Sequence, residues 1–324
     1  MPYCTETVRR ARQILAQRKA DRESEYREHL QNAYQQFPRL KEIDGQLRRS
    51  MALAAQTAFS KGEDVQKEMD AIKTANLALQ QDRQDLIARN FPKNYLDETP
   101  ICTHCGGSGY IGTSMCRCLS DLCRQVQKEE LSLLTTGKER FENFRLDVYS
   151  DRADPRYNAS PRDIMERNFQ LCRRYADGFL PGCGNLLFVG GTGLGKTFLS
   201  ACIADAVTDK GYSVTYESAP HLFAKLEKNR FNPDDQSRED VSRIANCDLL
   251  IIDDLGTEMP GSFVTAALYA LINDRLLAKK NMIISTNLLI EELGKRYSPQ
   301  IASRFQGNFR GLTFVGEDVR IRRI

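Results

Sequence analysis

Polar, helix-favouring side chains fill about the first 90 residues of the chain with few interruptions. Ala, Gln, Glu, Lys, Arg and Leu dominate this stretch, and such a composition favours α-helices. Pro38 and the Lys61-Gly62 step are natural break points, so we expect about three helices, arranged as an antiparallel coiled hairpin. Residues 1–99 are therefore predicted to form a helical domain, either a solvated spacer or a module that binds a partner protein.

Apolar runs alternate with helical stretches from Pro161 onward. NLLFVGG enters a glycine-rich turn and TFLSACIADAVTDKG leaves it, which is a strand, turn and helix in succession. Further strand candidates are YSVTYES, CDLLIIDD, NMIIST and a final pair, GLTFVG and DVRIRRI. Strands separated by helices predict an α/β fold, in which helices cover both faces of a parallel sheet. We place this domain at residues 161–324.

Two shorter segments separate these regions. The composition breaks at Phe91-Pro92, and a segment rich in glycine and cysteine follows at residues 100–123. Residues 124–160 are mixed and charged, and we interpret them as a linker. A chain of 324 residues is long enough for two domains, because domains usually contain roughly 100–200 residues each.

Charge and hydropathy restrict the partners and the cellular compartment that we expect for this protein. The net charge of +3 and a pI near 8.3 are too mild to indicate a nucleic-acid partner by themselves. No apolar run reaches the roughly 18 residues of a membrane span, and the N-terminus is charged, so we expect a soluble, cytoplasmic protein with no membrane partner. Its ten cysteines should then stay reduced. Basic clusters could line a DNA groove or could be solvated faces: Arg9, Arg10, Arg18, Lys19, Lys225, Lys228, Arg230, Arg320, Arg322 and Arg323.

GGTGLGKT fits the phosphate-loop pattern of Gly, any four residues, Gly, Lys and Ser or Thr. Glycines let the backbone wrap around phosphates and point N–H groups inward, and the following helix adds the positive end of its dipole. Lys196 should reach the β and γ phosphates of ATP, and the Thr197 hydroxyl should bind magnesium. The predicted nucleotide contacts are the loop and its next neighbour: Gly190, Gly191, Thr192, Gly193, Leu194, Gly195, Lys196, Thr197 and Phe198.

Two further strands end in polar side chains. LLIIDD ends in Asp253, which we expect to hold magnesium through water, and in Asp254, which would orient or deprotonate the attacking water. Apolar strands also end in Asp without such a role. NMIISTN delivers Asn287 to the same edge, where it either senses the γ phosphate or is an ordinary turn residue.

CTHCGGSGYIGTSMCRC contains two close cysteine pairs. Close pairs separated by a short turn can place four thiolates tetrahedrally around zinc. We therefore predict a structural zinc site at Cys102, Cys105, Cys116 and Cys118, with Cys123 or His104 as a possible replacement for one ligand. The remaining cysteines are interpreted as small buried residues.

These motifs together resemble bacterial or phage helicase loaders of the DnaC/DnaI type, in the AAA+ superfamily. The resemblance implies a five-stranded parallel sheet without a C-terminal lid, since only twenty residues follow Arg304. It also implies that Asp253 and Asp254 form Walker B, that Asn287 is the first sensor and that Arg304 is the arginine finger for a neighbouring subunit. KERFENFRLDVYS resembles the linker before the ATPase core, which would place Phe141 and Phe144 near adenine unless they serve only in packing.

The resemblance implies an ATPase that loads a hexameric replicative helicase onto single-stranded DNA and self-associates on ATP and DNA. Asp254 stands where many AAA+ members have Glu, which leaves the hydrolysis rate open. An IstB-like ATPase that assists a transposase shares the same core motifs. A third possibility is an adaptor in which ATP acts as a switch with negligible turnover.

Overall fold

The structure, a computed structural model of the chain, describes residue 3 and residues 5–59, 65–134 and 139–319. It divides into two compact units. One comprises Gln13–Cys116, and the other comprises Met1–Arg12 together with Arg117–Ile324.

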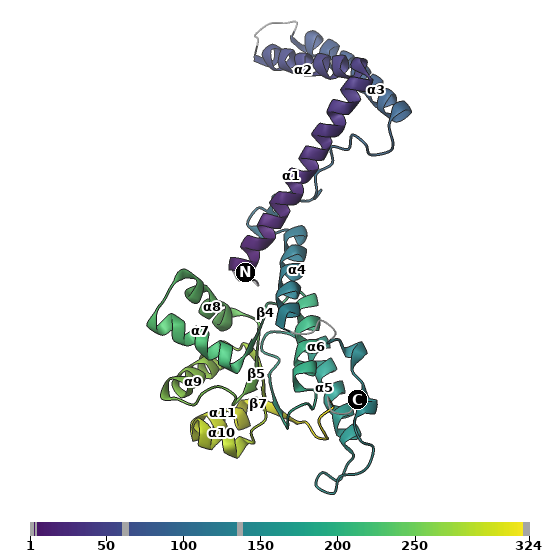
Figure 1. Cartoon of the computed structure of the whole chain (residues 1–324). Helices are drawn as coiled ribbons and strands as arrows, with labels where there is room; N and C mark the ends of the chain where they lie inside the picture. The colour runs from purple at the N-terminus through teal and green to yellow at the C-terminus, as the bar shows by residue number, and fades with distance from the viewer. Residues whose placement is uncertain (1–2, 4, 60–64, 135–138, 320–324) are drawn as a thin grey trace. The chain divides into compact units, whose positions relative to one another are not determined.

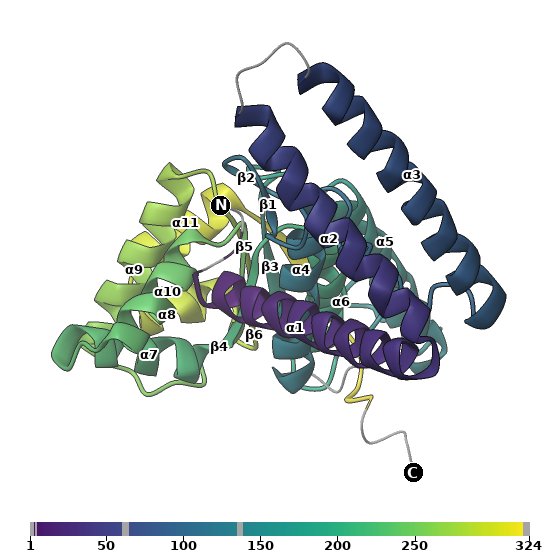
Figure 2. The same cartoon turned by 90° about the horizontal axis from the view of Figure 1, so that it is seen from above.

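Three long helices make up most of the smaller unit. They are α1 (Thr5–Gln36), whose first turns belong to the larger unit, α2 (Pro38–Phe59) and α3 (Val65–Asn90). Pro38 is the first residue of α2, where its missing N–H costs no hydrogen bond. Helices α2 and α3 lie side by side and run in opposite directions (Figure 2). The predicted three helices and the hairpin are confirmed.

A small core closes the base of this hairpin. Ala33, Leu40 and Leu96 are buried there. The rings of Phe91 and Tyr95 stack beside them, with centroids 5.1 Å apart. A few apolar side chains thus hold the helices at one end, while α3 has no fully buried residue among those described.

A short hairpin and a helix follow. Strands β1 (Tyr110–Ile111) and β2 (Ser114–Met115) pair antiparallel, and α4 (Arg117–Leu134) begins directly after them. Residues 124–160, interpreted as a linker, thus include more than half of helix α4. Two short 3₁₀ helices, η1 (Phe141–Asn143) and η2 (Leu146–Val148), lie further along the same stretch.

The larger unit is built on a five-stranded parallel sheet, which confirms the predicted α/β fold. The order is β4-β5-β6-β3-β7, so the first strand of the domain lies between the fourth and the fifth. The strands are β3 (Asn185–Val189), β4 (Val214–Ser218), β5 (Leu249–Leu255), β6 (Asn281–Thr286) and β7 (Phe309–Thr313).

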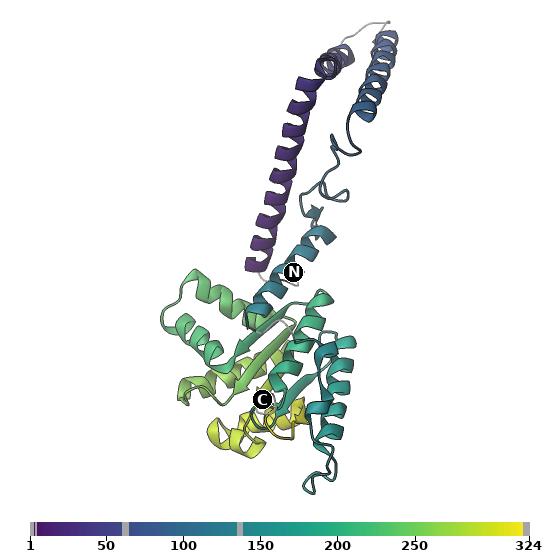
Figure 3. The same cartoon turned by 45° about the vertical axis from the view of Figure 1, so that its right-hand side comes forward.

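Helices cover both faces of this sheet (Figures 1 and 3). Helices α5 and α6 pack on one face, and α7 to α11 pack on the other. Their bounds are α5 (Pro161–Asp177), α6 (Lys196–Asp209), α7 (Ala219–Phe231), α8 (Asp235–Asn246), α9 (Ser262–Leu277), α10 (Ile290–Arg296) and α11 (Pro299–Asn308).

Alternation along the strands explains the two layers. Leu186 and Phe188 of β3 face the core under α5 and α6, and Leu187 between them faces the opposite core. Successive side chains of a strand point to opposite faces, so a run of apolar residues supplies both cores at once.

The end of the chain differs in part from the prediction. The expected strand GLTFVG is realised as β7, which begins two residues earlier at Phe309 and ends at Thr313. The strand DVRIRRI falls mainly on residues 320–324, outside the described residues, and so do Arg320, Arg322 and Arg323. Its first two residues, Asp318 and Val319, are not part of a strand.

One buried charge braces the sheet at the end where its strands begin. Arg275 of α9 is 1% exposed, and its guanidinium donates to the backbone oxygens of Ile244 (2.8 Å), Cys247 (3.1 Å) and Asn281 (2.7 Å). These bonds satisfy the last turn of α8 and join it to the starts of β5 and β6.

None of the described helices is both long and apolar enough to cross a membrane.

Candidate nucleotide-binding site

The phosphate loop joins strand β3, which lies between β6 and β7, to α6, as the strand, turn and helix pattern predicted. Gly193 (φ +73°) and Gly195 (φ +90°) adopt backbone conformations that favour glycine, and Gly195 directly precedes the first residue of α6. The helix N-terminus therefore opens into the loop, where it can receive an anion.

Lys196 is buried at the base of this loop. Its ammonium donates to the backbone oxygens of Gly190 and Gly191, each at 2.7 Å, and the residue is 5% exposed. The lysine is thus held against the loop. Thr197, the proposed magnesium ligand, follows it on the exposed side of α6.

Two segments far away in the sequence pack against the outside of the loop. The Tyr149 hydroxyl donates to the Leu194 carbonyl at 3.1 Å, and burial raises the pKa of Tyr149 to about 12, so this donor stays protonated at neutral pH. Beyond β7, the Val319 N–H donates to the Gly193 carbonyl at 3.1 Å. The carboxylate of Asp318 lies beside the same glycine.

Asp253 is held firmly at the end of β5. It is 7% exposed, and it accepts hydrogen bonds from the hydroxyls of Tyr216 (2.9 Å) and Ser285. Burial raises the pKa of Tyr216 well above its usual value, and Asp253 raises it further, so the phenol remains a donor. Hydroxyls from the two flanking strands therefore orient this carboxylate.

Asp254, the last residue but one of β5, has an unusual backbone conformation. Its φ is +55°, it lies in an irregular stretch of the pairing between β5 and β6, and its side chain is exposed. The Asp254 N–H donates to Ser285 Oγ at 2.9 Å. A non-glycine residue in the left-handed region costs on the order of 1–3 kcal/mol and is most common at functional sites.

Asn287 and the phosphate loop meet at the same edge of the sheet. Val189, just before the loop, pairs with Thr286, and the Gly190 N–H donates to the Thr286 carbonyl at 3.2 Å. Asn287 follows Thr286 and is exposed, beside Gly256 of the loop after β5. The parallel sheet thus brings Lys196, Asp253, Asp254 and Asn287 to one edge.

Phe141 and Phe144 belong to an aromatic cluster. The Phe144 ring lies 5.2 Å from that of Phe169 and 5.7 Å from that of Phe198, centroid to centroid, and Phe141 meets the edge of Phe169. Both phenylalanines therefore take part in packing, and Phe144 also approaches Gly195 of the phosphate loop.

Arg304 lies elsewhere on the surface. It is exposed on α11, and hydrogen bonds with Asn273 and, to a lesser extent, with Arg304 lower the pKa of the Tyr269 phenol on α9. Nothing in the described residues joins Arg304 to the phosphate loop of its own chain.

Most of the described basic candidates for DNA contact have acidic partners. Arg9 pairs with Glu6 and Arg10 with Glu129. The remaining pairs join Lys19 to Glu23, Lys225 to Glu217 and Lys228 to Asp234. Arg230 instead lies 5.6 Å from the centroids of two rings, those of Phe231 and Phe263.

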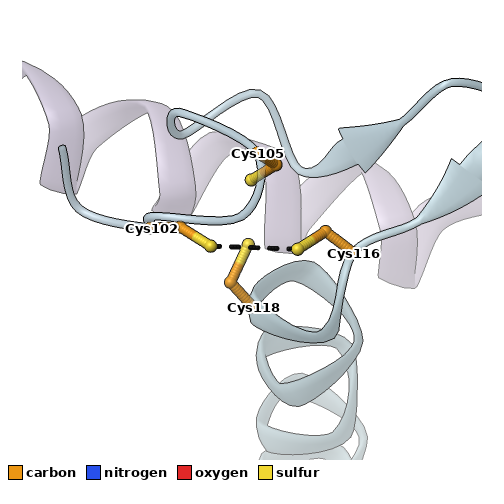
Figure 4. Close-up of side chains that lie close together, drawn as sticks. All are labelled: Cys102, Cys105, Cys116 and Cys118. Atoms are coloured by element: carbon orange, nitrogen blue, oxygen red, sulfur yellow. Dashed lines mark hydrogen bonds between the residues drawn. The ribbon is translucent and has the colours of Figure 1, made fainter.

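The four predicted cysteine ligands converge (Figure 4). The sulfurs of Cys102, Cys105, Cys116 and Cys118 all lie within 4.8 Å of one another, and those of Cys102 and Cys116 are 3.8 Å apart. Four thiolates on one zinc at about 2.3 Å would place their sulfurs about 3.8 Å apart. Cys123, the alternative ligand, is instead fully buried on α4.

Sequence reasoning missed the hydroxyl donors around the site. Tyr216 and Ser285 lie on strands that flank β5, and only the register of the sheet brings them to Asp253. Tyr149 lies within KERFENFRLDVYS, where no motif marks it as a donor to the loop. The sequence does offer one signal for Ser285, because it lies at the polar end of NMIISTN, two residues before the predicted site residue Asn287.

Residues 170–302 match the family described as IstB-like ATP binding protein. The replicative helicase loader DnaC of Escherichia coli is 23% identical over 151 residues, which are 46% of this chain and 62% of that protein. The chain thus spans less than two thirds of the loader's length. A putative insertion sequence ATP-binding protein of Sinorhizobium fredii is 25% identical over 226 residues, 64% of this chain and 91% of that protein.

Two solved structures align with parts of this chain. A crystal structure of the DnaC helicase loader aligns with 54% of this chain and 98% of its own, at a TM-score of 0.44 and 22% identity. A crystal structure of DnaI aligns with 53% of this chain and 95% of its own, at a TM-score of 0.43 and 19% identity.

Proposed function

We propose that this protein, whose residues 170–302 match the IstB-like ATP-binding family, is an ATPase that loads a hexameric replicative helicase onto single-stranded DNA. One observation carries the proposal. The ammonium of Lys196, the buried carboxylate of Asp253 and the exposed carboxylate of Asp254 lie at one edge of the sheet, around a glycine loop that opens a helix.

The site fits ATP with magnesium. The N–H groups at the start of α6 and the Lys196 ammonium would bind phosphate oxygens, once the lysine turns from its two backbone acceptors. Thr197 and, through water, Asp253 would hold magnesium, which neutralises phosphate charge. Asp254 would orient or deprotonate the attacking water, and Asn287 would sense the γ phosphate.

The helical unit favours the loader over a transposase partner. The match to the insertion sequence protein covers 64% of this chain and the match to DnaC covers 46%, so the content of the helical unit, and not coverage, favours the loader. This chain carries additional helices and a four-cysteine cluster, which suit a separate partner-binding module. The likeness to that protein still makes an ATPase that assists a transposase the second candidate.

A patch at the end of α7 supports contact with single-stranded DNA. Phe231 is 68% exposed, and Arg230 lies over its ring and over that of Phe263. Exposed aromatic rings beside a cation suit stacked bases near a phosphate backbone. Since Lys225 and Lys228 are ion-paired, this patch is a better candidate than the wider basic cluster.

Two further assignments complete the proposal. Zinc bound by the four cysteines would stabilise the segment that joins the helices to α4, because a closed site with four ligands has no open position for chemistry. Arg304 would act on the nucleotide of a neighbouring subunit, so that self-association on ATP and DNA completes each site.

Loading onto a closed DNA circle tests the function. A ring-shaped helicase cannot thread onto a circle without an end, so we would measure helicase retained on circular single-stranded DNA with and without this protein. We expect retention to require the protein and ATP, and to fail with Lys196→Ala. An unchanged amount of bound helicase would reject the loader.

Two variants separate the alternatives. Asp254→Ala should bind ATP without hydrolysing it, so an adaptor that uses ATP only as a switch would still load helicase with this variant, whereas an ATPase-driven loader would not complete repeated rounds. For the second candidate, the same protein is added to a transposase and its DNA. Stimulated strand transfer, together with no effect on helicase retention, would favour the insertion sequence role.

A further inference from the structure

We propose that Glu258 is a positioning residue that links the loop after Asp254 to the helix carrying Arg304. The proposal rests on the ATPase activity proposed above, and it adds a residue that acts through its neighbours and not on the nucleotide itself. Glu258 lies four residues beyond Asp254, in the loop between β5 and α9.

Glu258 is a buried carboxylate with partners on both sides. It is 5% exposed, and its Oε2 accepts a hydrogen bond from the Gly256 N–H at 2.9 Å. Its Oε1 accepts from the Tyr297 hydroxyl and lies 3.6 Å from the Arg296 guanidinium, which also donates to the Glu258 carbonyl. One side chain therefore joins the loop after β5 to the end of α10.

Hydrogen bonds and a nearby guanidinium compensate for the burial of the Glu258 carboxyl group. A buried carboxylate is costly unless hydrogen bonds and a cation satisfy it, and Glu258 has both. Burial raises the pKa of the Tyr297 phenol, and its hydrogen bond to Glu258 raises it further, so Tyr297 stays a donor. An apolar residue would fill the same space without the free-energy cost of desolvating a carboxylate, so the glutamate suggests a role beyond packing.

On one side, the network reaches Asp254. The Asp254 carbonyl accepts from the Thr257 N–H (3.2 Å) and hydroxyl (2.8 Å), which closes a tight turn. Gly256 within this turn has φ +107°, and its N–H is the one that Glu258 holds. Fixing Gly256 therefore fixes the turn that keeps Asp254 in its left-handed conformation, with its carboxylate at the edge of the sheet.

On the other side, the network reaches α11. Tyr297 follows the last residue of α10, and Ser298 directly after it caps α11 by accepting from the Ile301 N–H at 3.3 Å. Arg304 lies further along α11. A displacement of the Asp254 turn would thus be transmitted through Glu258 and Tyr297 to the helix of the finger. The link couples a subunit's own ATP site to the group that it offers a neighbour.

Substitution of Glu258 tests this link in the full-length protein. Glu258→Gln keeps the shape of the side chain and removes its charge. We expect kcat for ATP hydrolysis to fall on the order of tenfold, the effect of losing one hydrogen bond to a charged group, with ATP affinity within about twofold of the original. Glu258→Asp, which keeps the charge, should recover part of kcat. Glu291→Gln is the matched control, because Glu291 is exposed on α10.

A second measurement does not depend on hydrolysis. Hydrogen–deuterium exchange of residues 290–308 is compared with and without a non-hydrolysable ATP analogue and magnesium. The analogue should slow exchange in the unsubstituted protein and in Glu291→Gln. In Glu258→Gln it should protect only the phosphate loop, and Tyr297→Phe, a milder change, should give the same pattern.

The kinetic and exchange measurements can each overturn the proposed role of Glu258. Normal kcat and a normal exchange response in Glu258→Gln would overturn the proposal. So would equal losses of ATP binding, kcat and thermal stability in both Glu258→Gln and Tyr297→Phe, since these indicate a purely structural contact. If the unsubstituted protein responds to the analogue but does not hydrolyse ATP, the proposed ATPase activity is refuted. The comparison of hydrogen–deuterium exchange between the unsubstituted protein and Glu258→Gln then still tests the link through Glu258.

Discussion

Replacing Gly195 by alanine tests whether the phosphate loop needs its observed backbone. Gly195 has φ +90° and ψ 11° just before α6. An L-residue in this left-handed region costs about 1–2 kcal/mol. The added methyl would also lie 2.7 Å from the Tyr149 hydroxyl oxygen, which must then move away from the Leu194 carbonyl. That hydrogen bond contributes about 0.5–1.5 kcal/mol, so the total is roughly 2–3 kcal/mol.

This strain should appear in two measurements. If the loop relaxes to a conformation that cannot bind phosphate, affinity for a fluorescent ATP analogue should fall about 30- to 150-fold, since each 1.4 kcal/mol is a factor of ten. If the loop keeps its shape, the midpoint of thermal unfolding should fall by about 4–12 °C for a domain of this size. We expect the loss to be divided between them.

Gly191→Ala is the matched control within the same loop. Gly191 does not have a left-handed backbone, and its added methyl would make only ordinary contact, 3.6 Å from the Leu194 side chain. Tyr149→Phe combined with Gly195→Ala removes the clash and should restore part of the stability. Equal behaviour of Gly191→Ala and Gly195→Ala in both assays would refute the reasoning.

Three further predictions concern the site and the cysteine cluster. Lys196→Ala should lower ATP affinity by at least about tenfold or abolish turnover without unfolding the protein, because its charge is needed for phosphate; titration with a fluorescent analogue and a melting curve decide this. Cys102→Ser or Cys116→Ser should remove one tightly held zinc per chain, measured by elemental analysis after desalting, and a folded, chelator-resistant, metal-free original protein would contradict the site. Arg304→Ala and Asp254→Ala should each abolish phosphate release while ATP still binds, and a mixture of the two should regain part of it. No recovery despite demonstrated co-assembly would exclude Arg304 as a finger acting between subunits.

The sequence predicted local chemistry better than chemistry assembled across strands. The phosphate loop could be read directly, because its glycines, its lysine and the helix after it are consecutive. The donors to Asp253 could not, since Tyr216 and Ser285 meet it only through the register of three strands. The position of Asn287 could be predicted in part, because the carboxyl ends of parallel strands lie at one edge of the sheet, but its role could not.

Helix α4 has an apolar face that can be recognised in the sequence. Leu119, Leu122, Cys123 and Val126 recur at the spacing of one helical face, and all four are buried. The cysteine pattern and the surrounding charges predict a metal-binding segment and a linker over the same residues, and so conceal this helix. The extent of the zinc segment along residues 100–123 accordingly remains a prediction, since α4 begins at Arg117 within it.

In a mutational screen of this protein that measures only activity, Arg275 would be mistaken for a catalytic residue. It is an arginine on a helix of the larger unit, and its replacement should abolish function in cells. Substitution by lysine should rescue poorly, because one ammonium cannot reproduce the fork that serves three backbone oxygens. Such a profile resembles that of a catalytic arginine. Yet Arg275 braces the starts of β5 and β6, the opposite end of the strands from the phosphate loop. Measuring the amount of folded protein beside activity would separate the two kinds of essential arginine, because Arg304 variants should accumulate normally and Arg275 variants should not.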